Sequence, residues 1–321
     1  MMSFDFSVTK DFEQKSEPTM YASEHICIAS QRNGKKCSKM AMFEGQFCKT
    51  HARSIKNRKE LPKNPNESLE KERKLSKHEA SIAEAAAINK ANGQQGKVSC
   101  TKLYMKQSVP DVDGYKKVFP IKGKHDGGYW CPTLSPMRMG PILHGQPGLP
   151  PARNLENLHQ ANKVFPSEVS GFAKEPTSEW FETRKRMYLD STPHRHKEAA
   201  LKGVSRGGKK NVPLYSMWRL ENGTEAKFDY FNSRQFYCHF YEGFAKRSYE
   251  FAYLKWMHEN GINLQIVGYD GRELTGTMEE MYLDERYPFG QELIIVSMLT
   301  INDPKLYPWN IHNNVKLPNV M

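Results

Sequence analysis

Residues 154–165, NLENLHQANKVF, carry four side chains capable of chemistry at helical spacing. His159, Gln160 and Lys163 follow Glu156 at offsets of three, four and seven residues, so a helix would present all four on one side. The apolar positions between them are Leu155, Leu158 and Val164. A carboxylate, an imidazole, an amide and an ammonium beside an apolar stripe fit two interpretations: a solvated helix face or the rim of an active site.

A second set of candidates lies near the N-terminus, where Cys27, Cys37, Cys48 and His51 form the pattern C-x9-C-x10-C-x2-H. Zn²⁺ prefers a tetrahedron of such ligands, and the close Cys48–His51 pair can hold the ion from one short turn. A segment this small cannot build its own core, so metal binding would supply most of its folding free energy. We therefore predict a structural zinc ion within residues 23–53. The alternative is a set of four unrelated side chains.

The cysteine and histidine spacing resembles the Cys3His zinc motif of the plant WRC domain, and the resemblance is confined to this segment. Basic residues surround it, among them Arg32, Lys35, Lys36 and Lys39. We therefore expect the module to contact nucleic acid, although zinc modules also dock proteins.

The elements that must position the 154–165 stretch can be located from periodicity. The spacing predicts a helix at 177–190 and one or two helices at 233–261, where Asn260 and Gly261 give a C-terminal stop. Residues 262–269, INLQIVGY, alternate as a short strand, and residues 288–301 form a buried apolar segment. Residues 54–97 have almost no apolar face, which predicts a polar helix from about Leu69 to Ala91 and a linker role.

Glu156, Gln160 and Lys163 resemble the signature helix of the NADAR family, small α-helical N-glycosidases whose motif reads approximately E-H-x-x-Q-x-x-K. Asn157 stands where that family usually has His. LSPM (134–137) resembles the family's LSNF-type loop, and PFGQEL (288–293) resembles the turn that opens its last helix. The resemblance spans residues 130–300. It implies a mainly α (α+β) fold with a few short strands.

The resemblance also implies hydrolysis of a ribosyl N-glycosidic bond, in substrates such as ADP-ribosylated guanine in DNA or phosphoribosyl intermediates of riboflavin synthesis. Because that cleavage develops positive charge on the sugar, a partly buried carboxylate would stabilise the charge or activate the attacking water. Glu156 is the candidate. Lys163 would keep that carboxylate ionised or contact phosphate, and Gln160 would orient a ribose hydroxyl or the water. No organic cofactor is implied, and the zinc is structural.

Further side chains are candidates for the same site. Asp270 fits a second catalytic carboxylate or an ordinary Asp-Gly turn. Residues 191–197, STPHRHK, together with the glycines and lysines that follow, fit a flexible basic loop for phosphates. Aromatic side chains can stack on a base, although Trp218 also fits a core position. The candidates for substrate binding are Trp130, Trp218, His159, Arg234 and Asp284.

Composition narrows the class of protein. The net charge of +11 suits a polyanion partner. No stretch approaches the ~20 apolar residues of a membrane span, and the first residues, MMSFDFSVTKDFEQ, lack the basic and apolar regions of a secretory signal. The six cysteines do not suggest a secreted disulfide framework, so we expect a reducing, cytoplasmic location.

These observations predict a lead-in at 1–22, a zinc module at 23–53, a polar helical linker at 54–97 and a NADAR-like catalytic domain at 98–321. The expected partner is nucleic acid or a nucleotide, without a membrane. Two alternatives remain. A non-enzymatic nucleic-acid-binding or scaffold protein would be favoured if Glu156 pointed into open solvent. A different nucleotide-modifying enzyme would be favoured if Cys131 or His194 lined the pocket instead.

Overall fold

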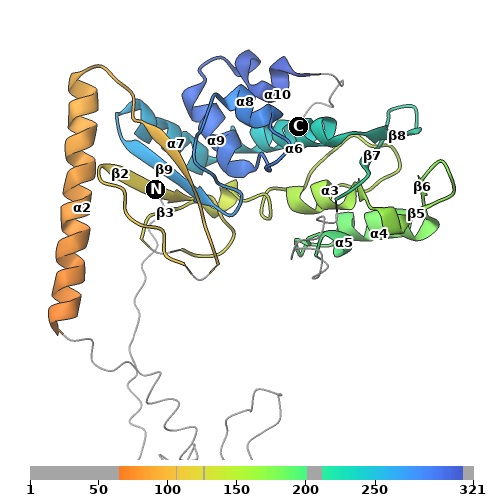
Figure 1. Cartoon of the computed structure of the whole chain (residues 1–321), viewed down its shortest axis with the longest axis horizontal. Helices are drawn as coiled ribbons and strands as arrows, with labels where there is room; N and C mark the ends of the chain where they lie inside the picture. Colours follow the sequence, from red (N-terminus) through yellow and green to blue (C-terminus); the bar gives the residue numbers. More distant parts are fainter. Residues whose placement is uncertain (1–64, 106, 126, 201–211, 314–321) are drawn as a thin grey trace, which may run out of the picture. The chain divides into compact units, whose positions relative to one another are not determined.

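The computed structural model describes residues 65–105, 107–125, 127–200 and 212–313, drawn in colour in Figure 1. The four predicted zinc ligands, the lead-in and most of the basic loop after His196 lie outside these residues. The chain divides into two compact units, Met1–Arg73 and Lys74–Met321. The second unit is a mixed α/β body. The expectation of helices accompanied by a few strands is therefore confirmed at this coarse level.

A four-stranded parallel sheet in the order β1-β9-β2-β3 organises one part of this body. Its strands are β1 (Val98–Lys102), β2 (Tyr115–Phe119), β3 (Tyr129–Trp130) and β9 (Asn263–Gly268). Although β9 comes last in the chain, it lies between β1 and β2, with Ile266 paired to both Cys100 and Val118. All six residues of β9 are buried, as expected for a parallel strand covered on both faces.

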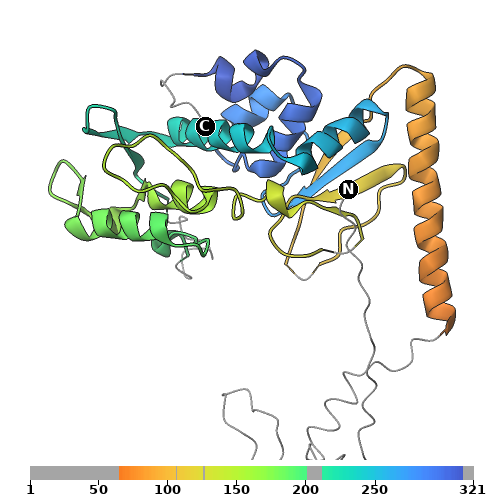
Figure 2. The same ribbon diagram turned by 180° about the vertical axis from the view of Figure 1, so that it is seen from behind.

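The two faces of this sheet are covered by different parts of the chain. Leu264 and Ile266 of β9 join the main core with α7 (Tyr249–Glu259) and α9 (Gln291–Thr300), which lie on the same side of the sheet in Figures 1 and 2. Val267 points to the opposite face because side chains alternate along a strand. There it packs in a smaller cluster with Leu103, Val109, Phe119 and Ile121.

The helix α6 (Tyr230–Ala245) connects this sheet region with a second group of elements, because it contacts both α9 and α3 (Leu155–Ala161) (Figure 1). The second group contains α4 (Ser178–Leu189) and an antiparallel sheet in the order β4-β7-β8. Those strands are β4 (Lys163–Val164), β7 (Tyr215–Arg219) and β8 (Glu225–Phe228). The shorter described elements are β5 (Val169–Ser170), β6 (Glu175–Pro176), α5 (Lys197–Ala200), α8 (Met278–Leu283) and α10 (Pro308–Ile311).

Local patterns placed most of these elements. The helix predicted at 177–190 is α4, whose Thr177 side chain accepts a hydrogen bond from the Trp180 amide at 3.3 Å. The region predicted at 233–261 is two helices, α6 and α7, with Ser248 as the N-cap of the second. The predicted strand at 262–269 is β9, and the apolar segment at 288–301 contains α9.

The larger compact unit includes most of α2 (Pro65–Ala91), because it begins at Lys74 within that helix. The Asn89 side chain is buried and its Nδ2 donates to the Gly261 carbonyl at 2.7 Å and to Asn263 Oδ1 at 2.9 Å. Polar contacts and small residues therefore attach the second half of α2 to the body, which a search for an apolar face does not detect.

Gly96 tests how tightly β1 is set against the end of α7 and the start of β9. A Cβ at Gly96 would lie 1.9 Å from the Ile262 carbonyl oxygen, which belongs to the backbone and cannot rotate away. We expect Gly96→Ala to lower the free energy of unfolding by about 1–3 kcal/mol in urea titrations. Gly123→Ala, which meets no atom within 4 Å, should change it by less than about 0.5 kcal/mol. Equal stability of the two variants would contradict this packing.

Candidate active site

The helix α3 presents the predicted catalytic side chains from a short, well-anchored platform. The Asn154 side chain caps it by accepting the Asn157 amide at 2.8 Å. Leu155 and Leu158 are buried in the core, while Glu156 and His159 are half-buried. The helical spacing predicted that Lys163 lies on this helix, but the helix ends at Ala161. Lys163 instead lies in β4, where it pairs with Ser216.

The three signature side chains nevertheless meet. Gln160 Nε2 donates to Glu156 Oε1 at 2.9 Å, and Lys163 Nζ donates to Gln160 Oε1 at 3.2 Å. The amide therefore bridges the carboxylate and the ammonium, donating to one and accepting from the other. The same Gln160 oxygen accepts the His196 amide at 3.4 Å.

Burial is the main influence on both charged groups of this chain. It raises the pKa of Glu156, against the opposing effects of the Gln160 hydrogen bond and the Lys163 charge. It lowers the pKa of Lys163 to about 8, against the attraction of Glu156. The charges of Arg195 and Asp270 act on both groups as well. Glu156 therefore does not point into open solvent. Of the four residues in this charge cluster, Glu156 and Lys163 are half-buried, whereas Arg195 and Asp270 are exposed.

The segment 190–196 is held over α3 by Asn157, the residue that departs from the family motif. Its Nδ2 donates to the carbonyls of Asp190 and Thr192, both at 2.9 Å, and its Oδ1 accepts the His194 amide at 2.7 Å. This part of the predicted flexible loop is therefore fixed, and it brings Arg195 to the charge cluster. His194 itself pairs with Asp190 at 2.6 Å.

Tyr237 of α6 lies beside the cluster. Its ring centre lies 4.9 Å from that of His159. Burial raises the pKa of Tyr237 well above its usual value, and the carboxylates of Glu156, Glu292 and Asp270 add to the effect. Burial and the Lys163 charge lower the pKa of His159 well below its usual value, so its imidazole is neutral near pH 7.

Glu292, in the first turn of α9, is a buried carboxyl group that sequence reasoning missed. It is 1% exposed, and neither oxygen has a hydrogen-bond partner that meets ordinary geometry among the described residues. A Cβ at Gly290 would lie 3.0 Å from Glu292 Oε2 and 3.3 Å from Asp270 Oδ2, which places these two oxygens within about 6 Å of each other. Its sequence signal was a single acid at the head of a buried apolar run.

A small cavity of about 20 Å³ adjoins the cluster, and His159 and Tyr237 contribute to its wall. Trp218 lines the same cavity but is 7% exposed and stacks on Phe236 with ring centres 4.2 Å apart. The cavity has room for a water molecule rather than a base. Trp218 is therefore part of the core in this conformation.

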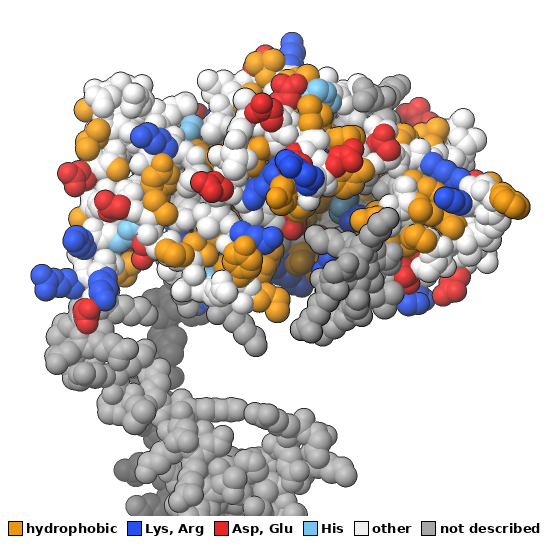
Figure 3. All heavy atoms as spheres, viewed as in Figure 1, with side chains coloured by type: hydrophobic (Ala, Val, Ile, Leu, Met, Phe, Trp, Pro, Cys, Tyr) orange, Lys and Arg blue, Asp and Glu red, His pale blue; other side chains and the backbone are white. Residues whose placement is uncertain are grey.

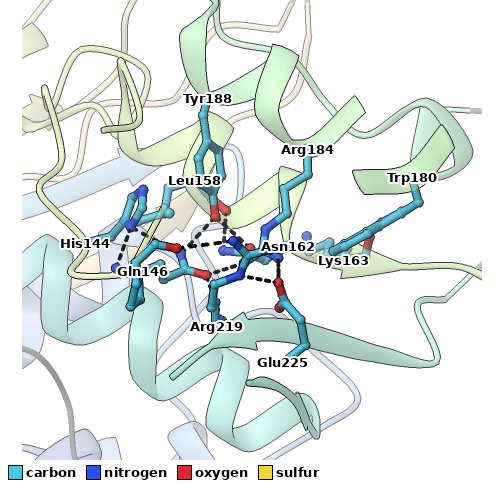
Figure 4. A network of polar contacts seen from close by, with 11 residues as sticks. His144, Gln146, Leu158, Asn162, Lys163, Trp180, Arg184, Tyr188, Arg219 and Glu225 are labelled. Carbon is cyan, nitrogen blue, oxygen red and sulfur yellow. Dashed lines mark hydrogen bonds and ion pairs between the residues drawn. The ribbon is translucent and has the colours of Figure 1, made fainter. Parts of the chain in front are cut away.

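The end of α3 is fixed from behind by a buried polar network (Figure 4). Tyr188 donates from its hydroxyl to Asn162 Oδ1 at 2.7 Å and accepts from Gln146 Nε2 at 3.0 Å. Arg184, 1% exposed, donates to Gln146 and forms an ion pair with Glu225 at 2.9 Å. Trp180 Nε1 donates to the Lys163 carbonyl at 2.9 Å. The network links α4, β7 and β8 to the residues that carry Gln160 and Lys163.

The other predicted binding residues lie in structural contacts. Trp130 Nε1 donates to the Ile121 carbonyl at 2.9 Å. Arg234 is buried and donates to the backbone carbonyls of Tyr282, Asp284 and Tyr287. The Asp284 carboxylate accepts from Arg286 and Arg272, which lower its pKa. These contacts occupy the polar groups of all three residues.

Comparison with protein-family models, with curated proteins and with solved structures finds no match to this chain. Among the described residues, no group of three or more His, Cys, Asp or Glu side chains could hold a metal ion. Within the same residues, no helix combines the length and apolar character needed to cross a membrane.

The burial of Glu292 has a consequence for stability. Burial and the nearby Asp270 carboxylate raise its pKa to about 8, so between its ordinary value of 4.5 and about 8 the folded protein holds a proton that the unfolded chain has released. Stability must fall as the pH rises through this window. We expect Glu292→Gln to remove roughly 2–4 kcal/mol of the decrease between about pH 5 and pH 8.

Urea unfolding of both proteins at the two pH values measures this difference. Any fixed cost of the new amide cancels in the comparison. A wild-type and a variant protein with parallel pH dependence would show that Glu292 is ionised in the folded state.

Proposed function

We propose that this protein hydrolyses a ribosyl N-glycosidic bond in a nucleotide or a modified nucleic acid, with Glu156 as the catalytic carboxylate. The single observation that carries the proposal is the sheltered Glu156–Gln160–Lys163 chain, in which a half-buried carboxyl group and an ammonium are held 2.9 and 3.2 Å from one bridging amide. The resemblance of this motif, and of the flanking segments, to NADAR N-glycosidases agrees with it.

The reaction suits such a cluster. As the bond from the anomeric carbon to nitrogen breaks, its electron pair leaves with the base nitrogen, which then takes up a proton. Positive charge develops on the sugar, and water bonds to the anomeric carbon and gives up a proton. A carboxylate out of bulk water stabilises that cation more strongly than an exposed one, and it can also accept the proton of the water.

The neighbours of Glu156 divide the remaining tasks. Lys163 keeps the carboxylate available as an anion or meets a phosphate, and Arg195 adds a second cation for the same purposes. Gln160 orients Glu156 and has a fixed amide plane that can align a ribose hydroxyl. Asp270 supplies a second carboxylate, contributed by the turn that follows β9, and its charge acts on Glu156, Lys163 and Tyr237.

The charge distribution supports a separate place for polyanion contacts. Of 47 Lys and Arg and 36 Asp and Glu, 18 and 8 belong to residues that the structure does not describe, which leaves 29 and 28 in the described part. On the face shown in Figure 3, the two signs are interspersed. Most of the excess positive charge, 9 of 11, thus belongs to residues 1–64 and 201–211. We propose that these segments attract nucleic acid, with a zinc ion on Cys27, Cys37, Cys48 and His51.

The same distribution favours one second candidate function. A protein that binds nucleic acid through its basic segments without catalysis would show the same charge excess. It would not require a half-buried carboxylate held beside an ammonium, which is why we place hydrolysis first.

Glu156→Gln tests the catalytic assignment. Purified protein is offered ADP-ribosylated DNA and a panel of nucleotides, and release of the ribosyl product is followed. Because an amide cannot stabilise the cation or accept the proton, we expect a loss of about 10²-fold or more. Glu182→Gln, on an exposed position of α4, should keep wild-type turnover. Undiminished turnover in the Glu156 variant would remove this residue from the mechanism.

The zinc proposal is tested by elemental analysis of the full chain. We expect about one zinc ion per chain, and a large reduction after Cys48→Ala or His51→Ala. His25→Ala changes a histidine of the same segment that is outside the motif, so it should leave the zinc content unchanged. Wild-type protein purified without zinc, yet folded and unable to take it up, would exclude the site.

A further inference from the structure

A groove of about 690 Å³ lies beside the charge cluster, on the sheet face opposite to α7 and α9. Asp270 belongs to both, because it lines the groove and its charge acts on Glu156 and Lys163. Ser99 and Thr101 of β1 and Gln265 of β9 form its floor. Its volume is within the range of pockets that hold small organic ligands, unlike that of the small cavity. Asp270 is therefore the residue that the cluster and the groove share.

The floor carries polar atoms without partners. Gln265 is 3% exposed; its Nε2 donates to Thr101 Oγ1 at 2.9 Å, while its Oε1 has no hydrogen-bond partner among the described residues. Ser99 Oγ and Arg272 Nε are also buried and have no hydrogen-bond partner among the described residues. Buried polar atoms are almost always satisfied in native proteins. Three of the eight such atoms found among the described residues belong to residues that line this one groove, so a ligand bound there has polar groups available close to it.

The rim of the groove is aromatic. Tyr104 and Tyr287 are 55% and 50% exposed, and Tyr115 of β2 is half-buried. The Lys102 ammonium lies 5.6 Å from the Tyr104 ring centre, and the Arg272 guanidinium lies 4.8 Å from that of Tyr287. Exposed rings held by neighbouring cations form faces on which a nucleobase can stack.

The charges of the groove balance. Lys102 and Arg272 are matched by Asp270 and Glu273, and Arg272 is also paired with Asp284 at 3.1 Å. A run of phosphates would leave the two carboxylates opposed by like charge. A neutral group with hydroxyls and a flat ring suits the lining better, because carboxylates and amides accept from sugar hydroxyls while the tyrosines stack on a base.

We propose that this groove is a second nucleoside subsite, which holds the base and ribose next to the nucleotide that is cleaved. The position of this subsite relative to a cleaved nucleotide rests on the proposed hydrolase function. The groove and the chemistry of its ligand do not depend on that function. The second nucleoside has two possible sources, the distal adenosine of an ADP-ribosyl group or the neighbouring nucleoside of a strand.

Binding of probes to the full chain tests the subsite separately from turnover, provided that each probe is recovered unchanged after the titration. AMP, ribose 5-phosphate, ADP-ribose and an unmodified dinucleotide are titrated by calorimetry or NMR. We expect AMP to bind at least about 10-fold more tightly than ribose 5-phosphate, since only AMP has a base to stack. Tyr104→Ala should weaken AMP binding by about 5- to 100-fold, and Tyr104→Phe should restore it. Tyr249→Ala, 79% exposed on α7, is the matched control and should bind as wild type.

The ADP-ribose and dinucleotide titrations distinguish the two possible sources of the second nucleoside. If Tyr104→Ala weakens ADP-ribose but not the dinucleotide, the occupant is the distal adenosine; the reverse result identifies a neighbouring nucleoside in a strand. Equal affinity for AMP and ribose 5-phosphate, or affinities that no Tyr104 variant changes, would overturn the subsite. Unchanged turnover in Glu156→Gln together with Tyr104-dependent AMP binding would instead remove the hydrolase mechanism and leave the nucleoside site standing.

Discussion

The candidate site depends on keeping a carboxylate and an ammonium together at a place where water is scarce. Burial raises the pKa of Glu156 and lowers that of Lys163, so either charge alone would favour its neutral form. Gln160 stabilises both charged forms, because its amide donates to the carboxylate and accepts from the ammonium. Removing either partner would leave the other group buried and uncompensated, which is why such pairs require an accurately fixed backbone.

That accuracy comes from two separately built supports. The network of Arg184, Gln146 and Tyr188 behind α3 joins buried polar groups to one another, although Arg184 Nε has no partner among the described residues, and such hydrogen bonds stiffen the backbone that carries them. On the other side, β9 is buried on both faces and ends at the turn that carries Asp270. The helix α6 contacts both regions and contributes Tyr237. The site thus forms where the end of β9, the end of α3 and the segment 190–196 come together. A shift in any of these three would alter the balance of charge around Glu156.

Local sequence patterns were sufficient for the parts of the fold that depend on near neighbours. Caps and apolar spacing gave α4, α6, α7 and β9, and helical spacing brought Glu156 and Gln160 together. Helical spacing wrongly placed Lys163 on the helix. The helix ends at Ala161 and Lys163 pairs with the distant Ser216, which the local spacing of residues does not reveal. The insertion of β9 between β1 and β2 and the approach of Glu292 to Asp270 depend on contacts across long sequence separations. A single sequence does not encode these contacts in any local pattern.

In the proposed function, the balance of charge would separate two kinds of recognition. Because the described body carries 29 basic and 28 acidic side chains, it exerts little long-range attraction on a polyanion. Selection there must come from short-range terms such as stacking, hydrogen bonds and the placement of single charges. The basic excess of residues 1–64 and 201–211 can attract a strand from a distance, and this attraction weakens as salt is added. An encounter governed by salt and a recognition step governed by shape would then respond to different substitutions. Under the proposed function, the hydrogen-bonded Glu156–Gln160–Lys163 chain would not also have to capture the substrate, which is compatible with its partial burial.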